Sequence, residues 1–322
     1  MDQVIRVENL VKEYDNKKSN KKIRAVNNIN LRVNRGEKVG YIGLNGAGKS
    51  TTIKLLTGLI CPTSGKINIL GFEPFKDRKT YVNHIGVLFG QRNQMFWDLK
   101  VKDSLEFNRH IYKLSEDQYE EKIKFFNKYI DLESLMDSKV MTLSLGQKMR
   151  CNLAMALLHS PEIIFLDEPT IGIDIFVKDE IRNLINEVNR SFNTTVLYTS
   201  HDMKDIEQIC DRIIILEQGK IIEDLPIQKF NNKYGGIKRV KLFFDGDEEI
   251  ETLESELWRL SSYKFISFDL DKSRKSLSCS FNDKEISTLD LLKTFQSIGL
   301  CIENAEINSS SLEDAIKNIY QS

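Results

Sequence analysis

The sequence predicts an α/β fold built on a parallel sheet, with an antiparallel β subdomain, a helical subdomain insertion and a small C-terminal α+β domain. Three observations lead to this prediction. An apolar strand at residues 38–42 runs through a glycine-rich turn into a helix over residues 49–59. Further apolar strands at residues 163–166 and 195–198 are separated by helical segments, which is the pattern of a parallel sheet. Beyond residue 234 the pattern changes to short alternating strands and helices.

The remaining elements of the larger part follow in chain order. Residues 4–10 and 29–33 are β-branched and partly alternating, with a polar turn between them, which predicts short antiparallel strands. The next long stretch lacks strong strand patterns and is rich in Glu, Lys, Leu and Phe, so we expect a helical subdomain at about residues 92–158. Strands at residues 212–216 and 221–222 then close the core.

Two glycines after Tyr234 predict a hinge, so we divide the chain into residues 1–234 and an accessory domain at residues 235–322. The second part follows the ferredoxin-like order βαββαβ and ends in a further helix. Its expected elements are residues 240–244, 250–260, 265–270, 276–281, 287–298, 301–307 and 312–320. This part has no histidine and no constellation of ligands or nucleophiles, and only its position suggests a dimer-stabilising or regulatory role.

Composition narrows the classes of partner. The chain has 322 residues, and its 46 basic and 47 acidic residues nearly cancel. No overall field therefore favours nucleic acid, which we do not expect as a partner. The five cysteines lack metal-ligand or redox spacing, which indicates free thiols in a reducing cytosol.

The sequence contains no segment that we expect to cross a membrane. Its first residues lack the basic-then-apolar pattern of a signal peptide. The longest apolar runs, such as residues 163–166, have the length of a strand, whereas a spanning helix needs about 20 apolar residues. If the protein serves transport, we expect another chain to supply the channel.

The glycine-rich turn matches a phosphate-binding loop. The pattern G-x-x-x-x-G-K-[ST] is fitted by Gly43-Leu44-Asn45-Gly46-Ala47-Gly48-Lys49-Ser50, between a strand and a helix as the motif requires. Glycines let several backbone N–H groups point at one phosphate cluster, and the helix N-terminus adds its positive end. We expect Lys49 to reach the β- and γ-phosphates and the Ser50 hydroxyl to hold Mg²⁺. A chance glycine turn is the alternative.

Two adjacent acids end the apolar strand at residues 163–166. Ligands bind beyond the carboxyl ends of parallel strands, so Asp167 and Glu168 should lie beside the phosphate-binding loop. We expect Asp167 near Mg²⁺, directly or through water, and Glu168 to polarise the attacking water. The alternative is an ordinary acid pair at a helix N-terminus.

Three further motifs stand at ordered positions: Leu143-Ser144-Leu145-Gly146-Gln147, Asp167-Glu168-Pro169-Thr170 and Thr199-Ser200-His201-Asp202. With the phosphate-binding loop they resemble the nucleotide-binding subunits of ABC transporters, whose signature is normally Leu-Ser-Gly-Gly-Gln. The resemblance covers about residues 4–224. It implies a P-loop ABC ATPase that powers transport, in the direction of export, through separate membrane subunits. A soluble ABC-type ATPase with a non-transport target, and a binding module that no longer hydrolyses, are the alternatives.

The resemblance implies roles for individual residues. Gln91 is similar to the glutamine that senses Mg²⁺ and water, His201 to the histidine that contacts the γ-phosphate, and Asp174 to the loop that communicates across the dimer. Tyr14 is similar to the aromatic that stacks on adenine, whereas we expect Tyr41 in the core. The implied catalytic residues are Lys49, Gln91, Glu168 and His201. The implied metal contacts are Ser50, Gln91 and Asp167. The implied ATP contacts are Tyr14, Gly43, Asn45, Gly46, Ala47, Gly48, Lys49, Ser50, Thr51, Ser144, Gly146, Gln147 and Asp174. Taken alone, Gln91 would be a surface residue, His201 a helix-start residue and Ser200 a helix cap.

The resemblance also implies partners and a place in the cell. Two subunits, identical or of two ABC types, would sandwich ATP, with Ser144 and Gly146 binding the γ-phosphate held by the opposite subunit. The sequence departs from the signature at Leu145, and Ile171 replaces the usual serine of the dimer-communicating loop. Together with residues 89–92 and 96–99, these variants resemble a bacterial exporter-like branch of the family. Phe96 and Trp97 are candidates for docking a transmembrane permease subunit, with buried core as the alternative. We expect the protein in the cytoplasm, on the inner face of the cell membrane.

Overall fold

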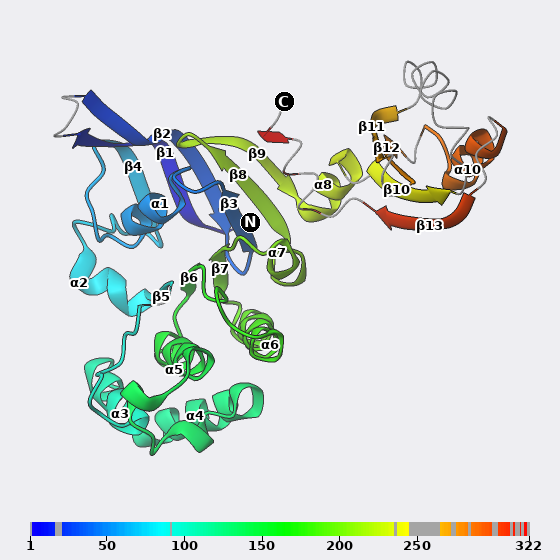
Figure 1. The fold of residues 1–322 in the computed structure, drawn as a ribbon. Helices are drawn as coiled ribbons and strands as arrows, with labels where there is room; N and C mark the ends of the chain where they lie inside the picture. Colours follow the sequence, from blue (N-terminus) through cyan, green and yellow to red (C-terminus); the bar gives the residue numbers. More distant parts are fainter. Residues whose placement is uncertain are drawn as a thin grey trace. The chain divides into compact units, whose positions relative to one another are not determined.

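The computed structural model describes most of the chain as two compact units. The described residues are 2–16, 21–90, 92–234, 237–244, 265–271, 275–282, 285–297 and 302–309, with Leu312, Ile316, Ile319 and Tyr320. The units are Met1–Ile227 and Gln228–Ser322, so the break falls shortly before the boundary expected at residue 234. Figure 1 shows the elements of both units.

A three-stranded antiparallel sheet begins the first unit. Its strands are β1 (Gln3–Asn16), β2 (Lys21–Asn34) and β4 (Ser64–Ile69), in the order β2-β1-β4. The expectation of short strands around a long polar turn was wrong, because the polar residues continue the strands. Glu13 on β1 pairs across the hairpin with Lys22 at 3.6 Å and Arg24 at 2.8 Å, so charged side chains support the ladder.

A six-stranded, mainly parallel sheet forms the centre of the first unit. Its strands are β3 (Lys38–Gly43), β5 (Ile85–Phe89), β6 (Ile163–Asp167), β7 (Thr195–Thr199), β8 (Arg212–Glu217) and β9 (Lys220–Pro226). The order is β5-β6-β7-β3-β8-β9, and only β9 runs antiparallel to its neighbour. The loops after β3, β6 and β7 therefore meet at one edge of the sheet, which confirms the predicted parallel architecture. Tyr41 is fully buried here, as expected.

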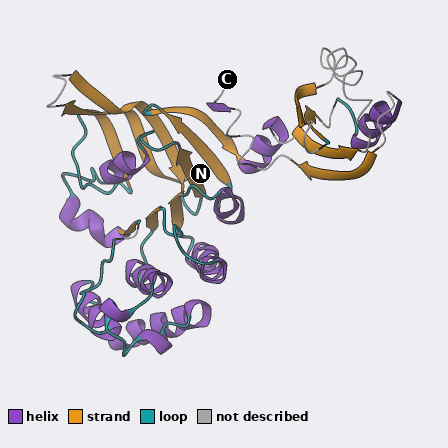
Figure 2. Cartoon of the chain, in the orientation of Figure 1, coloured by secondary structure: helices purple, strands orange, loops and turns teal. Residues whose placement is uncertain are grey.

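Helices accompany both sheets. Those flanking the central strands are α1 (Lys49–Leu56), α2 (Arg78–Tyr81), α6 (Ile175–Phe192) and α7 (Met203–Ile209). The expected helical subdomain holds α3 (Val101–Ile111), α4 (Glu116–Ile130) and α5 (Leu145–Leu157). Figure 2 shows these last three helices grouped apart from the antiparallel sheet. The amphipathic α4 begins at the capping residue Ser115 and buries Ile123 and Phe126.

The second unit has the strand order of a ferredoxin-like fold. After α8 (Ile227–Tyr234) come β10 (Ile237–Phe244), β11 (Phe265–Asp271), β12 (Ser276–Asn282), α10 (Thr288–Ser297) and β13 (Ile302–Ser309). The sheet order is β11-β12-β10-β13 with antiparallel neighbours, as predicted. The helix expected at residues 250–260 lies outside the described residues, and only Leu312, Ile316, Ile319 and Tyr320 of the last expected helix are described.

Among the described residues, no helix combines the length and the apolar character needed to span a bilayer. Cys61, Cys151, Cys210 and Cys279 are free thiols, and Cys301 lies outside the described residues.

Candidate functional site

The loop after β3 contains two glycines in a backbone conformation that residues with side chains rarely adopt. Gly46 and Gly48 have φ values of +84° and +103°. A Cβ added to Gly48 would lie 2.3 Å from the carbonyl oxygen of Ala25, whereas nothing lies within 4 Å of one added to Gly46. Gly48 therefore fixes the loop against β2, and the loop enters α1 at Lys49 with its amide groups around the helix N-terminus.

Two buried hydroxyl groups and a backbone hydrogen bond support this loop. The Thr52 hydroxyl donates to the Gly48 carbonyl oxygen at 3.0 Å and lies 3.2 Å from the Tyr41 hydroxyl oxygen. The Gly219 N–H donates to the Ala47 carbonyl oxygen at 3.0 Å. These contacts come from α1, β3 and the β8–β9 turn, so the loop conformation is fixed by the fold before any ligand binds.

Lys49 places a cation over the loop. Its Nζ donates to the Gly43 carbonyl oxygen at 2.6 Å and to that of Leu44 at 3.3 Å. Burial lowers the pKa of Lys49, and the nearby carboxylates of Glu168 and Asp167 oppose this shift. An anion bound in the loop would stabilise the charged ammonium, so the site favours phosphate oxygens.

Thr199 holds the two acids that follow β6. Its hydroxyl donates to Asp167 Oδ1 at 2.8 Å. The Glu168 N–H lies 3.0 Å from that hydroxyl oxygen and 3.1 Å from the Thr199 carbonyl oxygen. Glu168 has φ = +54°, which is uncommon for a residue with a side chain. A strained conformation of this kind persists where neighbouring contacts enforce it, and here the two contacts of the Glu168 N–H with Thr199 hold it.

His201 lies directly against Glu168. Its Nε2 is 2.7 Å from Glu168 Oε1, and the two side chains are 41% and 24% exposed. Because a carboxylate accepts, Nε2–H of His201 is the donor. A fixed carboxylate beside an imidazole, at the edge that also carries the phosphate-binding loop, can orient and deprotonate a water molecule.

The signature segment begins α5. Ser144 is the N-cap: its hydroxyl oxygen accepts from the Gln147 N–H at 3.3 Å, and Gln147 Oε1 accepts from the Ser144 N–H at 2.9 Å. Leu145 is half-buried in the first turn. Gly146 lies against α6, since an added Cβ would be 3.3 Å from Val177. The exposed Ser144 therefore stands at a helix N-terminus, a position that suits an anion.

The structure describes most of the other residues singled out in the sequence. Asp174 is the N-cap of α6, where Oδ1 accepts from the N–H groups of Phe176 and Val177 at 3.1 Å. Tyr14 is 42% exposed near the end of β1, with Lys12 Nζ at 5.2 Å from its ring centre. Asn45 is exposed and Thr51 half-buried. Gln91 lies outside the described residues. The alternative interpretation of Ser200 as a helix cap is wrong, because Asp202 is the residue that caps α7.

The available donors fit Mg²⁺ better than a softer metal. Asp167 is 8% exposed and Ser50 half-buried, so both offer oxygen atoms at the edge of the site. Among the described residues, no three His, Cys, Asp or Glu side chains group as a metal site. Mg²⁺ is commonly held by one or two protein oxygens together with substrate phosphates and water, which matches this sparse set.

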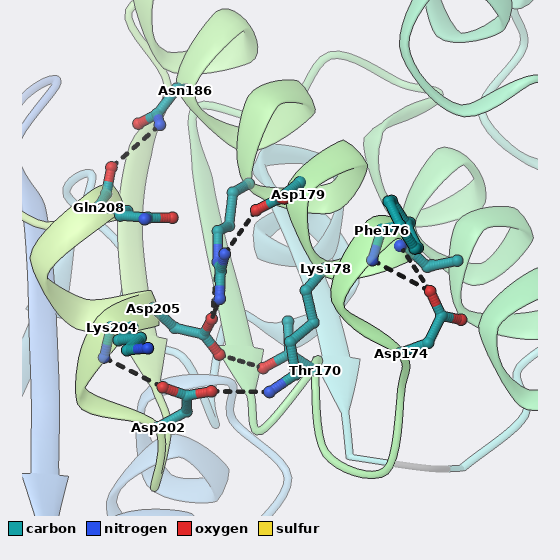
Figure 3. A network of polar contacts seen from close by, with 12 residues as sticks. Thr170, Asp174, Phe176, Lys178, Asp179, Asn186, Asp202, Lys204, Asp205 and Gln208 are labelled. Atoms are coloured by element: carbon teal, nitrogen blue, oxygen red, sulfur yellow. Dashed lines mark hydrogen bonds and ion pairs between the residues drawn. The ribbon is translucent and has the colours of Figure 1, made fainter.

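Sequence reasoning missed a buried carboxylate behind the site. Asp205 is fully buried on α7 and contacts Thr170, Ser200 and Arg182. Figure 3 shows Asp205 next to Thr170 and, beside them, Asp202 next to Lys178. The spacing of Arg182 and Asp205 in the sequence does not indicate their ion pair, because only the fold brings α6 and α7 together. Thr199 was part of a recognised motif, but its link to Asp167 and Glu168 was not foreseen.

Comparisons with known proteins agree on one family. The family description "ABC transporter" matches residues 26–171. The chain is 35% identical over 237 residues to the bacitracin transport ATP-binding protein BcrA of Bacillus licheniformis, covering 73% of this chain and 74% of that protein. It is 32% identical to the ABC transporter ATP-binding protein NatA of Bacillus subtilis, and the match covers 63% of this chain and 82% of that protein. It is 30% identical to the methionine import ATP-binding protein MetN 3 of Bacillus cereus, covering 99% and 97%.

Solved structures confirm the predicted fold. An ATP-binding subunit of an ABC transporter superposes with a TM-score of 0.65 at 27% identity, covering 72% of this chain and 93% of that one. A dimeric ATP-binding cassette in a post-hydrolysis state, bound to ADP and Pi, gives a TM-score of 0.62 at 26% identity, covering 69% and 98%.

Proposed function

Because the chain belongs to the family of ABC transporter ATP-binding proteins, a family of ATPases that power transport, we propose that Glu168 and His201 are its hydrolytic pair. The single observation that carries this assignment is the 2.7 Å contact between His201 Nε2 and Glu168 Oε1. This contact lies at the edge of the sheet where the charges of Glu168 and Asp167 stabilise the protonated form of Lys49.

We assign each of these residues a part in phosphoryl transfer. The amides of the loop and the Lys49 ammonium hold the phosphates and offset the charge that spreads over their oxygens in the transition state. Glu168 accepts a proton from the attacking water. His201, held at Glu168 Oε1, orients that carboxylate and reaches the γ-phosphate. Mg²⁺, held by Ser50 and Asp167, would add positive charge beside the phosphate oxygens.

Replacing Glu168 by Gln tests the assignment. The change keeps the shape of the side chain but removes the base, so kcat should fall at least about 100-fold while ATP affinity stays within about threefold. The measurement is phosphate release against ATP concentration, with nucleotide affinity taken from fluorescence titration. Unchanged hydrolysis in Glu168→Gln would remove Glu168 as the base.

We propose that two copies sandwich two ATP molecules, each between one phosphate-binding loop and the partner's signature. The exposed Ser144 at the N-terminus of α5 supports this, as it leaves a helix end free to meet an anion. The solved relatives include a dimeric cassette. Ser144→Tyr should block dimer formation while leaving ATP binding intact, and light scattering with ATP measures the fraction of dimer. A dimer fraction in Ser144→Tyr equal to that of wild type would contradict the proposed sandwich.

An apolar patch on the helical subdomain is our proposed docking surface for a membrane subunit. We define the patch as Phe96, Trp97, Leu99, Phe107 and Ile111, which are 42–54% exposed. The core alternative for Phe96 and Trp97 is therefore wrong. The rings of Phe96 and Phe107 pack edge to face with centroids 5.0 Å apart, so the segment before α3 and α3 itself both contribute to the patch. A patch of this kind suits an apolar cytoplasmic segment of a partner.

The patch can be tested by co-purification. Phe107→Ser should reduce recovery of the co-expressed membrane subunit severalfold and leave basal ATP hydrolysis unchanged. Phe192→Ser, at the end of α6 and 44% exposed, is the matched control outside the patch. Equal recovery with Phe107→Ser and wild type would dismiss the patch as the docking surface.

We propose that transport runs outward and that the protein acts at the cytoplasmic face of the membrane. The signature with Leu145 and the loop with Ile171 support this through their resemblance to the exporter-like branch. Cells expressing the chain with its membrane subunit should tolerate a peptide antibiotic such as bacitracin better than cells with Glu168→Gln. ATP-dependent methionine uptake instead would contradict export.

A further inference from the structure

We infer that Asp205 is a positioning residue for hydrolysis, whose buried carboxylate ties the segment after Glu168 to the segment before His201. The inference rests on the proposed function of the Glu168–His201 pair. Figure 3 shows Asp205 on α7 facing Thr170, with Asp202 and Lys178 beside them.

One carboxylate oxygen of Asp205 holds both segments. Oδ2 accepts hydrogen bonds from the hydroxyls of Thr170 at 2.5 Å, Ser200 at 3.2 Å and Tyr198 at 3.3 Å. Thr170 lies two residues after Glu168, and Ser200 directly precedes His201. The side chains of Asp205, Thr170, Ser200 and Tyr198 are all buried, so water does not compete for their hydrogen bonds.

Arg182 fixes the other carboxylate oxygen. Its Nε donates to Asp205 Oδ1 at 2.7 Å and its Nη2 donates to the same atom, while Nη1 donates to Asp179 at 2.6 Å. Arg182 is 6% exposed and Asp205 is 0% exposed. A buried carboxylate needs such a partner to stay ionised. The pair therefore places a charged acceptor at a defined position behind the site.

The contact belongs to a polar seam between α6 and α7. We define this seam by three contacts: Lys178 Nζ to Asp202 Oδ2 at 2.7 Å, Arg182 to Asp205, and Asn186 Nδ2 to the Gln208 carbonyl oxygen at 3.1 Å. Lys178, Arg182 and Asn186 recur every four residues, so one face of α6 makes all three contacts. α6 starts after Asp174 and α7 just after His201, so the seam fixes two loops of the site together.

A positioning role makes a distinct kinetic prediction. If Thr170 moves, Glu168 and His201 lose their alignment for water, whereas the phosphate-binding loop on β3 and α1 is untouched. A displacement of about 1 Å at a catalytic group can cost about 100-fold in rate. The loss should therefore appear in kcat and not in KM. A purely structural network would lower thermal stability and leave kcat unchanged below the melting temperature.

The test is steady-state ATP hydrolysis by the full-length chain carrying Thr170→Val, which removes the hydroxyl and keeps the shape. We expect kcat to fall at least about tenfold with KM within about threefold, and Thr170→Ser to restore kcat to within about threefold. Thr194→Val is the matched control, since the Thr194 hydroxyl is buried and donates to the Pro161 carbonyl oxygen at 3.1 Å. Its kcat should equal that of wild type.

The inference is overturned by wild-type kcat in folded Thr170→Val, or by an equal loss in Thr194→Val. If Thr170→Val does not fold, Ser200→Ala decides, because it removes the hydrogen bond between Asp205 and the residue that precedes His201. An unchanged kcat in Ser200→Ala overturns the inference as well. Wild-type protein that hydrolyses no ATP, with Mg²⁺ supplied, would instead overturn the proposed function.

Discussion

Acidification should destabilise the nucleotide-binding unit through His159, which follows α5. Its Nε2 lies 3.0 Å from the Ile85 carbonyl oxygen, and its ring stacks on Tyr112 with centroids 3.9 Å apart. A carbonyl can only accept, so Nε2 carries the proton. Nδ1 is buried and has no hydrogen-bond partner among the described residues. Protonation would therefore place an unpaired charge in the interior.

The magnitude follows from the pKa of His159. Burial, the largest cause, lowers this pKa from 6.5 to about 4. The unfolded chain takes up a proton below about pH 6.5 and the folded chain only below about pH 4, so stability falls as the pH drops between these values. At about 1.36 kcal/mol per pKa unit, the total loss is about 3 kcal/mol, of which about 2 kcal/mol falls between pH 7 and pH 5.

Urea unfolding of wild type and His159→Gln, followed by circular dichroism at pH 5, 6 and 7, measures this effect. The glutamine amide can still donate to the Ile85 carbonyl oxygen but does not titrate. The stability of wild type relative to the variant should fall by about 2 kcal/mol from pH 7 to pH 5. Parallel pH profiles for the two proteins would refute the assignment of a buried neutral imidazole.

Two further substitutions test the loop and the seam. Gly48→Ala should abolish detectable ATP binding in a fluorescence titration, because the added Cβ would lie 2.3 Å from the Ala25 carbonyl oxygen. Gly46→Ala should bind ATP more tightly than Gly48→Ala, because nothing lies within 4 Å of a Cβ added to Gly46. Equal ATP affinities of the two variants would contradict this explanation. Asp205→Asn should lower the free energy of unfolding by about 3–5 kcal/mol, since the buried Arg182 would keep only the exposed Asp179 as a charged partner. A loss below about 1 kcal/mol in urea unfolding would show that Arg182 and Asp205 do not act as a buried ion pair.

Local sequence patterns predicted the parts of the site that local chemistry determines. The loop around Gly48 and Lys49 needs glycines and a cation at fixed spacing, and the acids at Asp167 and Glu168 need only the end of a buried strand. The parallel sheet followed from the apolar strands, and the ferredoxin-like strand order followed from the alternation of elements after residue 234. These features depend on residues close together in the chain.

The missed features depend on contacts that the fold creates. Arg182 and Asp205 each have the sequence character of a solvated helix charge, and only the packing of α6 on α7 shows that they form a buried pair. The long β1–β2 hairpin was missed because its outer part is polar, and its cross-strand ion pairs replace the apolar alternation on which strand prediction relies. Gln91 stays a prediction, as it lies outside the described residues.

We propose that Glu168 activates water for ATP hydrolysis inside a dimer closed by nucleotide. The most direct measurement is the mass of Glu168→Gln by light scattering, with ATP and Mg²⁺ and, in parallel, with ADP. We expect twice the monomer mass of 37.3 kDa with ATP and the monomer mass with ADP. A monomer that binds ATP without turnover would contradict the sandwich, and a variant that turns over ATP at the wild-type rate would contradict the role of Glu168.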